Sequence, residues 1–224
     1  MGQGWTMRHI SIRLLLQTTV FTAALLAARG SDGASRAPTA GGDVQAKIEY
    51  CMDCHGHQGQ GYHGFLTMPR LAGQTSTYLE NQLRAFLEGR RDRNLFINMA
   101  RVHGLSPAMR AAVATRFQQL NPPILGGSPR NLAAAGAKIY EEGVPEANVP
   151  ACSACHGPAA TGQGEIPRLA GQLFSYTVRT LSTWNRDRGA AAEGENPAAV
   201  MAPIAHNLTP NQIAAIAAYV NTLR

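Results

Sequence analysis

Cys51–His55 (CMDCH) and Cys152–His156 (CSACH) are two copies of one pattern, C-x-x-C-H, and they contain all four cysteines of the chain. A zinc ribbon would need two C-x-x-C pairs about 15–20 residues apart, but these copies lie almost a hundred residues apart. A thioredoxin-like motif would lie in a βαβ context, and no strand pattern flanks either copy. A structural disulfide would not require a histidine directly after the second cysteine. The pattern therefore predicts covalent haem attachment at both copies.

The likeness between the two copies extends past the cysteines. The string PRLAGQ occurs at 69–74 and again at 167–172, and Tyr78 and Tyr176 lie at matching positions beyond it. An Arg-Asp-Arg triplet, a methionine and a Leu-Ser-Pro or Leu-Thr-Pro start signal then follow in both copies. This self-similarity indicates a duplicated domain.

A seam rich in Pro and Gly, residues 121–129, separates the copies and would break any helix. Domains as small as these are marginal on apolar burial alone, so each is expected to wrap around its porphyrin. Five segments are predicted: a signal peptide (1–30), a flexible tether (31–42), an N-terminal haem domain (43–121), a linker (122–128) and a C-terminal haem domain (129–224).

The leader contains basic residues, among them Arg8 and Arg13, and no acidic residue before an apolar stretch at 14–28. An apolar stretch of fifteen residues is shorter than a typical transmembrane helix and has the length of the apolar region of a signal peptide. We therefore predict export to the periplasm. An uncleaved N-terminal anchor is the alternative, and it would leave the protein associated with the membrane.

Scarce Val/Ile runs and abundant Ala favour helices over sheet, so the fold is predicted to be all-α. Several positions carry helix start signals. The predicted helices begin at Asp43, at Ser128–Pro129 with an end near Glu142, at a Thr77/Glu80 capping box with an end at Leu87, at Ser106–Pro107 and at Thr209–Pro210.

Each motif supplies one predicted proximal iron ligand, His55 or His156. The predicted cofactors are two covalently bound haem c groups, each with one iron, held by thioether bonds to Cys51, Cys54, Cys152 and Cys155. Four further histidines recur at no matching position and are expected at the surface: His57, His63, His103 and His206.

Met99 and Met201 are the predicted ligands on the opposite face of the irons. They precede Leu105 and Leu208 by six and seven residues, so they occupy equivalent places in the two copies. The other methionines of the first copy have no such equivalent in the second: Met52, Met68 and Met109.

Two His/Met irons would have no vacancy for a substrate, and a thioether ligand favours Fe(II). An electron carrier is therefore expected, with redox proteins as partners and no small-molecule substrate. A dihaem peroxidase is the enzymatic alternative, and it would need one open or switchable iron. Nucleic-acid binding has little support: four basic residues and one acidic residue precede Asp43, so 16 of the 20 basic and 13 of the 14 acidic residues remain from there on.

The repeated order C-x-x-C-H-G, PRLAGQ, Tyr, Met, Leu-Ser/Thr-Pro, helix resembles the dihaem class I cytochromes c of the cytochrome-c-four type, over residues 43–224. This resemblance implies two tandem class I cytochrome c domains in which the carbonyls of Pro69 and Pro167 accept hydrogen bonds from the proximal histidines. It also implies periplasmic electron transfer between a respiratory donor and a terminal oxidase or other periplasmic acceptor. The first copy departs from the pattern around Met99 and at Arg116, where the second has Tyr219. Whether the chain is a free carrier or a subunit of a larger complex stays open.

The N-terminal domain is the more basic of the two. From Asp43 to Leu125 there are nine basic and six acidic residues, whereas seven of each lie between Gly126 and Arg224. Arg90, Arg91 and Arg93 form the densest cluster. It is either a solvated helix end or a patch that steers an acidic redox partner towards the first haem.

Overall fold

The computed structural model describes residues 40–91, 104–188 and 197–224 together with Met1. The predicted signal peptide, most of the tether, Met99 and His103 lie outside the described residues. Every regular element in the described ranges is helical, with only isolated β-bridges beside the helices, which confirms the all-α prediction. None of these helices is both long enough and apolar enough to cross a membrane.

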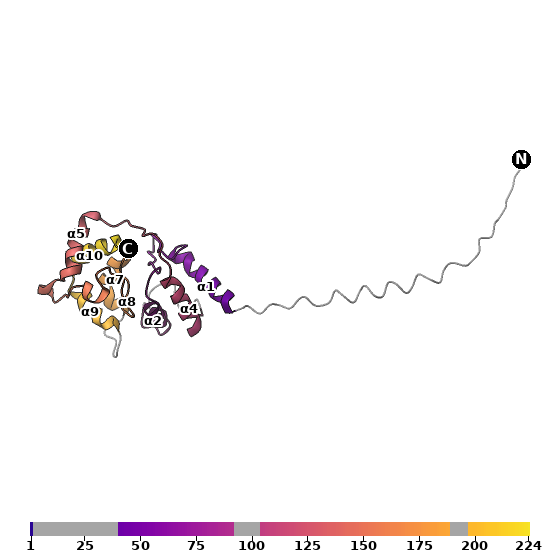
Figure 1. Ribbon diagram of the computed structural model, residues 1–224, viewed down its shortest axis with the longest axis horizontal. Helices are drawn as coiled ribbons and strands as arrows, with labels where there is room; N and C mark the ends of the chain where they lie inside the picture. Colours follow the sequence, from indigo (N-terminus) through magenta and orange to yellow (C-terminus); the bar gives the residue numbers. More distant parts are fainter. Residues whose placement is uncertain (2–39, 92–103, 189–196) are drawn as a thin grey trace. The chain divides into compact units, whose positions relative to one another are not determined.

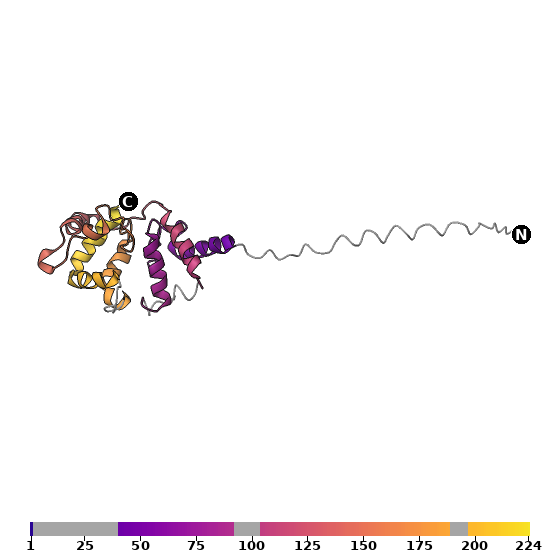
Figure 2. The ribbon, with the colours of Figure 1, turned by 60° about the horizontal axis from the view of Figure 1, so that its bottom comes forward.

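In the N-terminal half (40–121), the described helices are α1 (Ala40–His55), α2 (Ser76–Leu87) and α4 (Pro107–Gln118). Helix α4 packs against both α1 and α2 (Figures 1 and 2). Because all three helices turn apolar side chains towards one another, they share one buried cluster: Ile48, Leu79, Val113, Ala114 and Phe117.

The described helices of the C-terminal half (129–224) are η1 (Arg130–Leu132), α5 (Ala133–Glu142), η2 (Pro145–Ala147), α6 (Ser153–His156), α7 (Phe174–Ser182), α8 (Trp184–Arg188), α9 (Pro197–Asn207) and α10 (Pro210–Thr222). Helix α10, yellow in Figure 1, packs against α5 and α7. Its apolar face supplies Ile213, Ile216 and Val220 to a core that also buries Tyr140 and Leu208. The helical spacing of these α10 residues in the sequence is therefore that of a core face.

Two predicted helix starts are confirmed. The Ser106 hydroxyl accepts a hydrogen bond from the Met109 amide at 3.2 Å, with Pro107 in the first turn of α4. The Thr209 hydroxyl likewise accepts from the Gln212 amide at 3.3 Å, and Gln212 Oε1 accepts from the Thr209 amide at 2.8 Å, which completes a capping box.

Three other predicted starts are wrong. Thr75 caps α2 instead of Thr77, because Thr75 is still extended and its hydroxyl reaches the Tyr78 amide at 3.3 Å. Helix α1 already begins at Ala40, so Asp43 lies in its first turn, where its negative charge favours the helix dipole. Ser128 caps nothing regular, since the 3₁₀ turn η1 precedes α5; the predicted end at Glu142 is correct.

The C-x-x-C-H motifs of the two halves lie in different local structures. Helix α1 runs without a break into Cys51–His55, so the first motif is its last turn. In the second half Gly143 ends α5 with a φ of 75°, which favours glycine. A loop with a bridge between Val144 and Val149 follows before α6 carries the second motif.

Candidate haem sites

No two of the four cysteines form a disulfide. As long as their thiols are unattached, burial raises the pKa of Cys51 and of Cys152 to about 11. Cys54 and Cys155, the second thiols of the motifs, are exposed. Each half thus presents one enclosed and one accessible sulfur on the same turn as a histidine.

The two motif histidines are buried and oriented alike. His55 Nδ1 lies 2.8 Å from the Pro69 carbonyl oxygen, and His156 Nδ1 lies 2.8 Å from that of Pro167. A carbonyl only accepts, so Nδ1 is the donor and the ring lone pair is left on Nε2. Burial lowers the pKa of His156, although the bond to Pro167 opposes this effect. A neutral imidazole with a free lone pair on Nε2 is the state that binds iron.

A cavity of about 640 Å³ lies against both motifs. Its lining includes Cys51, His55, Cys152, His156 and Met201. Two thiols and one imidazole per half, around a largely apolar space, are the donor set of covalently attached haem c. The residues present therefore fit two such groups.

The described methionines differ in whether they line this cavity. Met201 on α9 and Met68 just before Pro69 both line the cavity, whereas Met52 and Met109 are not among its lining residues. Met99 lies outside the described residues, so the choice between Met99 and Met68 stays a prediction. Of the surplus histidines, His57, His63 and His206 are exposed, as expected.

The repeated PRLAGQ strings join the two halves by reciprocal hydrogen bonds. The Gln172 side chain accepts from the Arg70 amide at 2.9 Å and donates to the Arg70 carbonyl at 3.0 Å. Gln74 accepts from the Arg168 amide at 2.7 Å and donates to the Arg168 carbonyl at 3.0 Å. Such an exchange is the pattern of a two-fold interface. The repeated string therefore orients the motif histidine within each half through its proline carbonyl and also forms hydrogen bonds between the halves.

The arginines of these strings are not equivalent. The Arg70 guanidinium is buried and donates to the carbonyls of Ala72, Pro122 and Pro123, the last two in the linker. Arg168 donates from Nε to Ala170. Burial and the nearby Arg168 lower the pKa of Arg70 to about 10, which still leaves it charged at neutral pH. Arg70 thus holds the linker against the first half.

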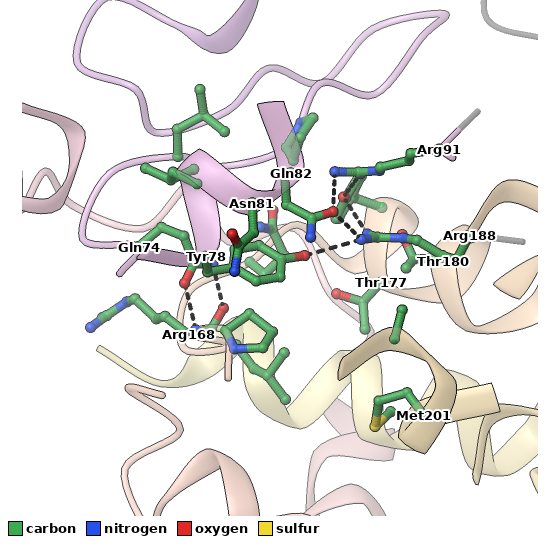
Figure 3. Close-up of a pocket in the computed structure, with 18 of the residues that line it drawn as sticks. Gln74, Tyr78, Asn81, Gln82, Arg91, Arg168, Thr177, Thr180, Arg188 and Met201 are labelled. Carbon is green, nitrogen blue, oxygen red and sulfur yellow. Dashed lines mark hydrogen bonds between the residues drawn. The ribbon is translucent and has the colours of Figure 1, made fainter. Parts of the chain in front are cut away.

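A polar cluster, which we call the interface cluster, consists of Tyr78, Gln82, Arg91 and Arg188, which Figure 3 labels, together with Tyr176. Arg188 crosses to the first half and donates to the Tyr78 hydroxyl at 3.2 Å and to Gln82 Oε1 at 2.6 Å. Arg91 crosses the other way to the Tyr176 hydroxyl at 3.0 Å and also reaches Gln82 Oε1 at 2.7 Å. Arg188 reaches Tyr176 as well, at 3.3 Å.

The interface cluster corrects the surface interpretation of the arginines. Arg188 is buried, and Arg91 bonds across the interface, so neither is a free docking residue. Arg90 is exposed and forms an ion pair with Glu88. The only hint of the cluster in the sequence was the repetition of Tyr and Arg-Asp-Arg in both copies, because the pairing itself depends on how the halves meet.

Burial and the mutual influence of two arginines and two phenols set the electrostatics of the cluster. Burial by itself would raise the pKa of Tyr176, but Arg91 and Arg188 together lower it to about 8. Burial and the like charge of Arg188 lower the pKa of Arg91. Within the described part of the chain, no ion pair includes either arginine.

Comparison with known proteins supports the assignment of a haem site in each half. The chain belongs to the cytochrome c family, which it matches over residues 42–121 and 133–224. It is 34% identical over 198 residues to cytochrome c-552 of Acidithiobacillus ferridurans, covering 85% of this chain and 83% of that protein. It is 34% identical over 187 residues to the thiosulfate dehydrogenase electron acceptor of Thiomonas intermedia, covering 81% and 82%.

Among solved structures, cytochrome c4 of Acidithiobacillus ferrooxidans matches with a TM-score of 0.64 at 34% identity, over 77% of this chain and 98% of that one. Within its family the chain is thus a two-haem electron carrier of the cytochrome c4 type, not an enzyme. Each of its two cytochrome c domains binds haem c covalently through a C-x-x-C-H motif.

Proposed function

We propose that both irons have His/Met ligation, with His55 and Met99 at haem 1 and His156 and Met201 at haem 2. The observation that carries this proposal is the imidazole orientation: in both halves Nδ1 bonds a proline carbonyl at 2.8 Å, which leaves Nε2 for the metal. When bound, the iron supplies reversible one-electron exchange. The protein orients the ring and surrounds the porphyrin with apolar side chains.

For the cellular role, we propose periplasmic electron transfer between a respiratory donor and a terminal oxidase or another periplasmic acceptor. The basic and then apolar leader supports export, since its pattern is that of a signal peptide. The proposed mature arrangement is a tether to residue 42, domains at 43–121 and 129–224, and a linker at 122–128. An uncleaved leader would keep this carrier at the membrane.

A second candidate role is the acceptance of electrons from a thiosulfate-oxidising dehydrogenase. Two relatives that are 34% identical to this chain are named thiosulfate dehydrogenase electron acceptors. This role involves the same haem chemistry with one dedicated donor, and it includes the case of an obligate subunit. The two roles differ in which protein reduces the haems.

Purification from the native host tests these proposals. We expect the protein in the periplasmic fraction, with about two haems per chain that resist acid-acetone extraction because thioether bonds hold them. Rapid reduction by thiosulfate only when a co-eluting dehydrogenase is present would favour the second role. A reporter that stays in the cytoplasm when fused to residues 1–30 would contradict export.

A further inference from the structure

The segment between the motif histidine and the PRLAGQ string contains a longer turn in the first half than in the second. The histidine and the proline that bonds it are 14 residues apart in the first half and 11 in the second. In each half one bridge closes this segment: Tyr62 with Met68 in the first and Gln163 with Ile166 in the second. Residues 63–67 lie inside the first bridge, but only residues 164–165 lie inside the second. We call residues 62–68 the aromatic turn.

The aromatic turn exposes large apolar side chains to solvent. The Phe65 side chain is fully exposed, and that of Tyr62 is 57% exposed. Neither residue lines the haem cavity, so this exposed surface faces solvent and not the space for a porphyrin. Among the described residues of the C-terminal half, only Val200 is an exposed large apolar side chain. Apolar side chains exposed together, as in this turn, mark interaction sites.

The backbone of the turn holds these side chains in place. Two hydrogen bonds between the Tyr62 and Met68 backbones, of 3.0 and 3.1 Å, close its base. The Tyr62 ring lies against the backbone of Gly64, where a Cβ would collide with the ring. Leu66, the residue after Phe65, lines the cavity that meets the first C-x-x-C-H motif. A protein seated on Phe65 would therefore lie close to the site of haem 1.

The charge of the turn narrows the choice of what binds there. Between Cys54 and Arg70 the sequence contains no Asp, Glu, Lys or Arg. Segments that bind anionic membranes contain lysines and arginines, and an acidic protein surface would also need such cations. A charged surface placed against this turn would lose hydration without gaining a paired charge. The turn therefore fits a surface that is apolar and uncharged.

The size of the turn narrows the choice further. A stable interface takes about 20–30 residues from each partner, whereas the aromatic turn has seven. It is thus too small to hold a permanent dimer, but electron-transfer encounters are the smallest class of specific protein contacts. Tyrosine and phenylalanine are enriched at the centre of such contacts. The turn therefore fits a short-lived encounter with a redox protein.

We propose that Phe65 and Tyr62 insert into an apolar, uncharged hollow on a redox protein that exchanges electrons with haem 1. The proposal rests on the electron-transfer role proposed above and adds the surface that the partner contacts. Since the second half has neither the longer turn nor an aromatic residue in its place, this partner meets haem 1 and not haem 2.

Steady-state kinetics of the full-length holoprotein test the contact. Washed membranes of the native host with oxygen oxidise the reduced protein, and a periplasmic extract with thiosulfate reduces the oxidised protein. With at least one of these fractions, Phe65→Gln should raise the KM for the cytochrome about tenfold and leave the maximal rate unchanged. Phe65→Leu keeps an apolar side chain, so its KM should stay near that of the wild type.

Tyr50→Gln is the matched control, because Tyr50 is an exposed aromatic residue on α1 of the same half. It should leave KM unchanged, and every variant should retain two covalent haems. An equal rise in KM from Tyr50→Gln, or no rise from Phe65→Gln with either fraction, would overturn the proposed surface. The oxidised variants, added as competitors of the wild type, measure binding separately from turnover: Phe65→Gln should inhibit about tenfold more weakly than Tyr50→Gln does.

Two charged substitutions test whether the partner's hollow is uncharged. Phe65→Lys and Phe65→Glu should raise KM alike, and the rise should persist at high ionic strength because no ion pair is involved. If one sign of charge preserves the wild-type KM while the other raises it, the turn meets a charged surface and the proposal is wrong.

Lipid or a second copy of the chain would also overturn the proposal. Protein-free vesicles of phosphatidylcholine and phosphatidylglycerol that bind the wild type but not Phe65→Gln would identify a membrane surface. A dimer in analytical ultracentrifugation that Phe65→Gln dissociates would identify a second copy. An unchanged KM in Phe65→Gln contradicts the docking surface alone, whereas a wild type that exchanges electrons with neither fraction contradicts the proposed role together with the surface.

Discussion

The two halves place the same motif by different means and orient its histidine in the same way. The first motif ends the continuous helix α1, whereas a loop separates the second from α5. Yet the His55 carbonyl accepts from the Gly61 amide at 2.7 Å, as the His156 carbonyl does from the Gly162 amide at 3.0 Å. The imidazole bond to proline is 2.8 Å in both. The comparison teaches that the bonds around the ring are retained while the route of the chain into the motif is free to vary.

A second difference concerns the turn residue whose carbonyl accepts hydrogen bonds from the PRLAGQ segment, and the core residue near it. The carbonyl of Gly59 accepts hydrogen bonds from this segment in the first half, and that of Ala160 does so in the second. Both residues have positive φ, 69° and 54°. The first half places Phe117 against its glycine, while the second has Val220 at the matching position, where its carbonyl bonds Gly171 as that of Phe117 bonds Gly73. The larger core residue thus accompanies the smaller turn residue.

The largest effect is expected from Met201→His. Exchange of a thioether for an imidazole removes the preference for Fe(II), so the potential of haem 2 should fall by about 0.2 V, a fraction of the roughly 0.8 V that axial ligands span. Redox titration measures this fall. The same substitution at Met68 should leave the potential of haem 1 near its wild-type value. If Met68→His lowers it instead, Met68 and not Met99 is the ligand of haem 1.

Gly59→Ala should come next and should affect the first half only. A Cβ at Gly59 would lie 2.8 Å from the Phe117 ring, and alanine at this φ is itself strained. Overpacking and strain together should lower the free energy of unfolding by about 2–4 kcal/mol. Unfolding in guanidinium chloride, followed by circular dichroism, measures this loss in the free energy of unfolding.

The double variant Gly59→Ala/Phe117→Val reproduces the pairing of the second half. It should recover at least about 1 kcal/mol relative to the sum of the two single changes, because the clash disappears. Strictly additive losses would show that the turn residue and the core residue are independent.

Arg70→Ala should open the linker more than Arg168→Ala does. The first change leaves three carbonyls without their charged donor, and the second removes one such bond. We expect losses of about 2 and about 1 kcal/mol. At 2 kcal/mol, proteolytic cleavage in the linker should be roughly 30-fold faster than in the wild type. Equal cleavage rates for the two variants would contradict the asymmetry.

The smallest effect should come from the helix caps. Thr209→Ala breaks a capping box and should cost about 1 kcal/mol, whereas Ser106→Ala breaks a single cap bond and should cost about half as much. Thermal unfolding of the two variants compares them. A larger loss for Ser106→Ala would contradict this ranking.

Local patterns in the sequence predicted much of this protein. The C-x-x-C-H motifs, the duplication and the starts of α4 and α10 are each written in a few neighbouring residues, because attachment chemistry and helix caps act over short distances. Thr75 was missed because Thr75 and Thr77 are equally good caps, and only the preceding turn decides which of them stays extended.

The interface could not be predicted in the same way. Gln74 pairs with Arg168 and Arg188 pairs with Tyr78 across about a hundred residues of sequence. A cluster of arginines in a sequence is compatible with a solvated helix end, a docking patch or a set of buried hydrogen bonds. Only the relative placement of the two halves separates Arg91 from the exposed Arg90.

The most direct measurement is the near-infrared sulfur-to-iron charge-transfer band of the oxidised protein, with its intensity expressed per covalently bound haem. If both halves bind their iron through a histidine and a methionine, the wild type should show the full intensity of two Met-ligated haems, and Met201→His should retain about half of it. A wild type with half the intensity, or a band that Met201→His leaves unchanged, would contradict equivalent His/Met sites in the two halves.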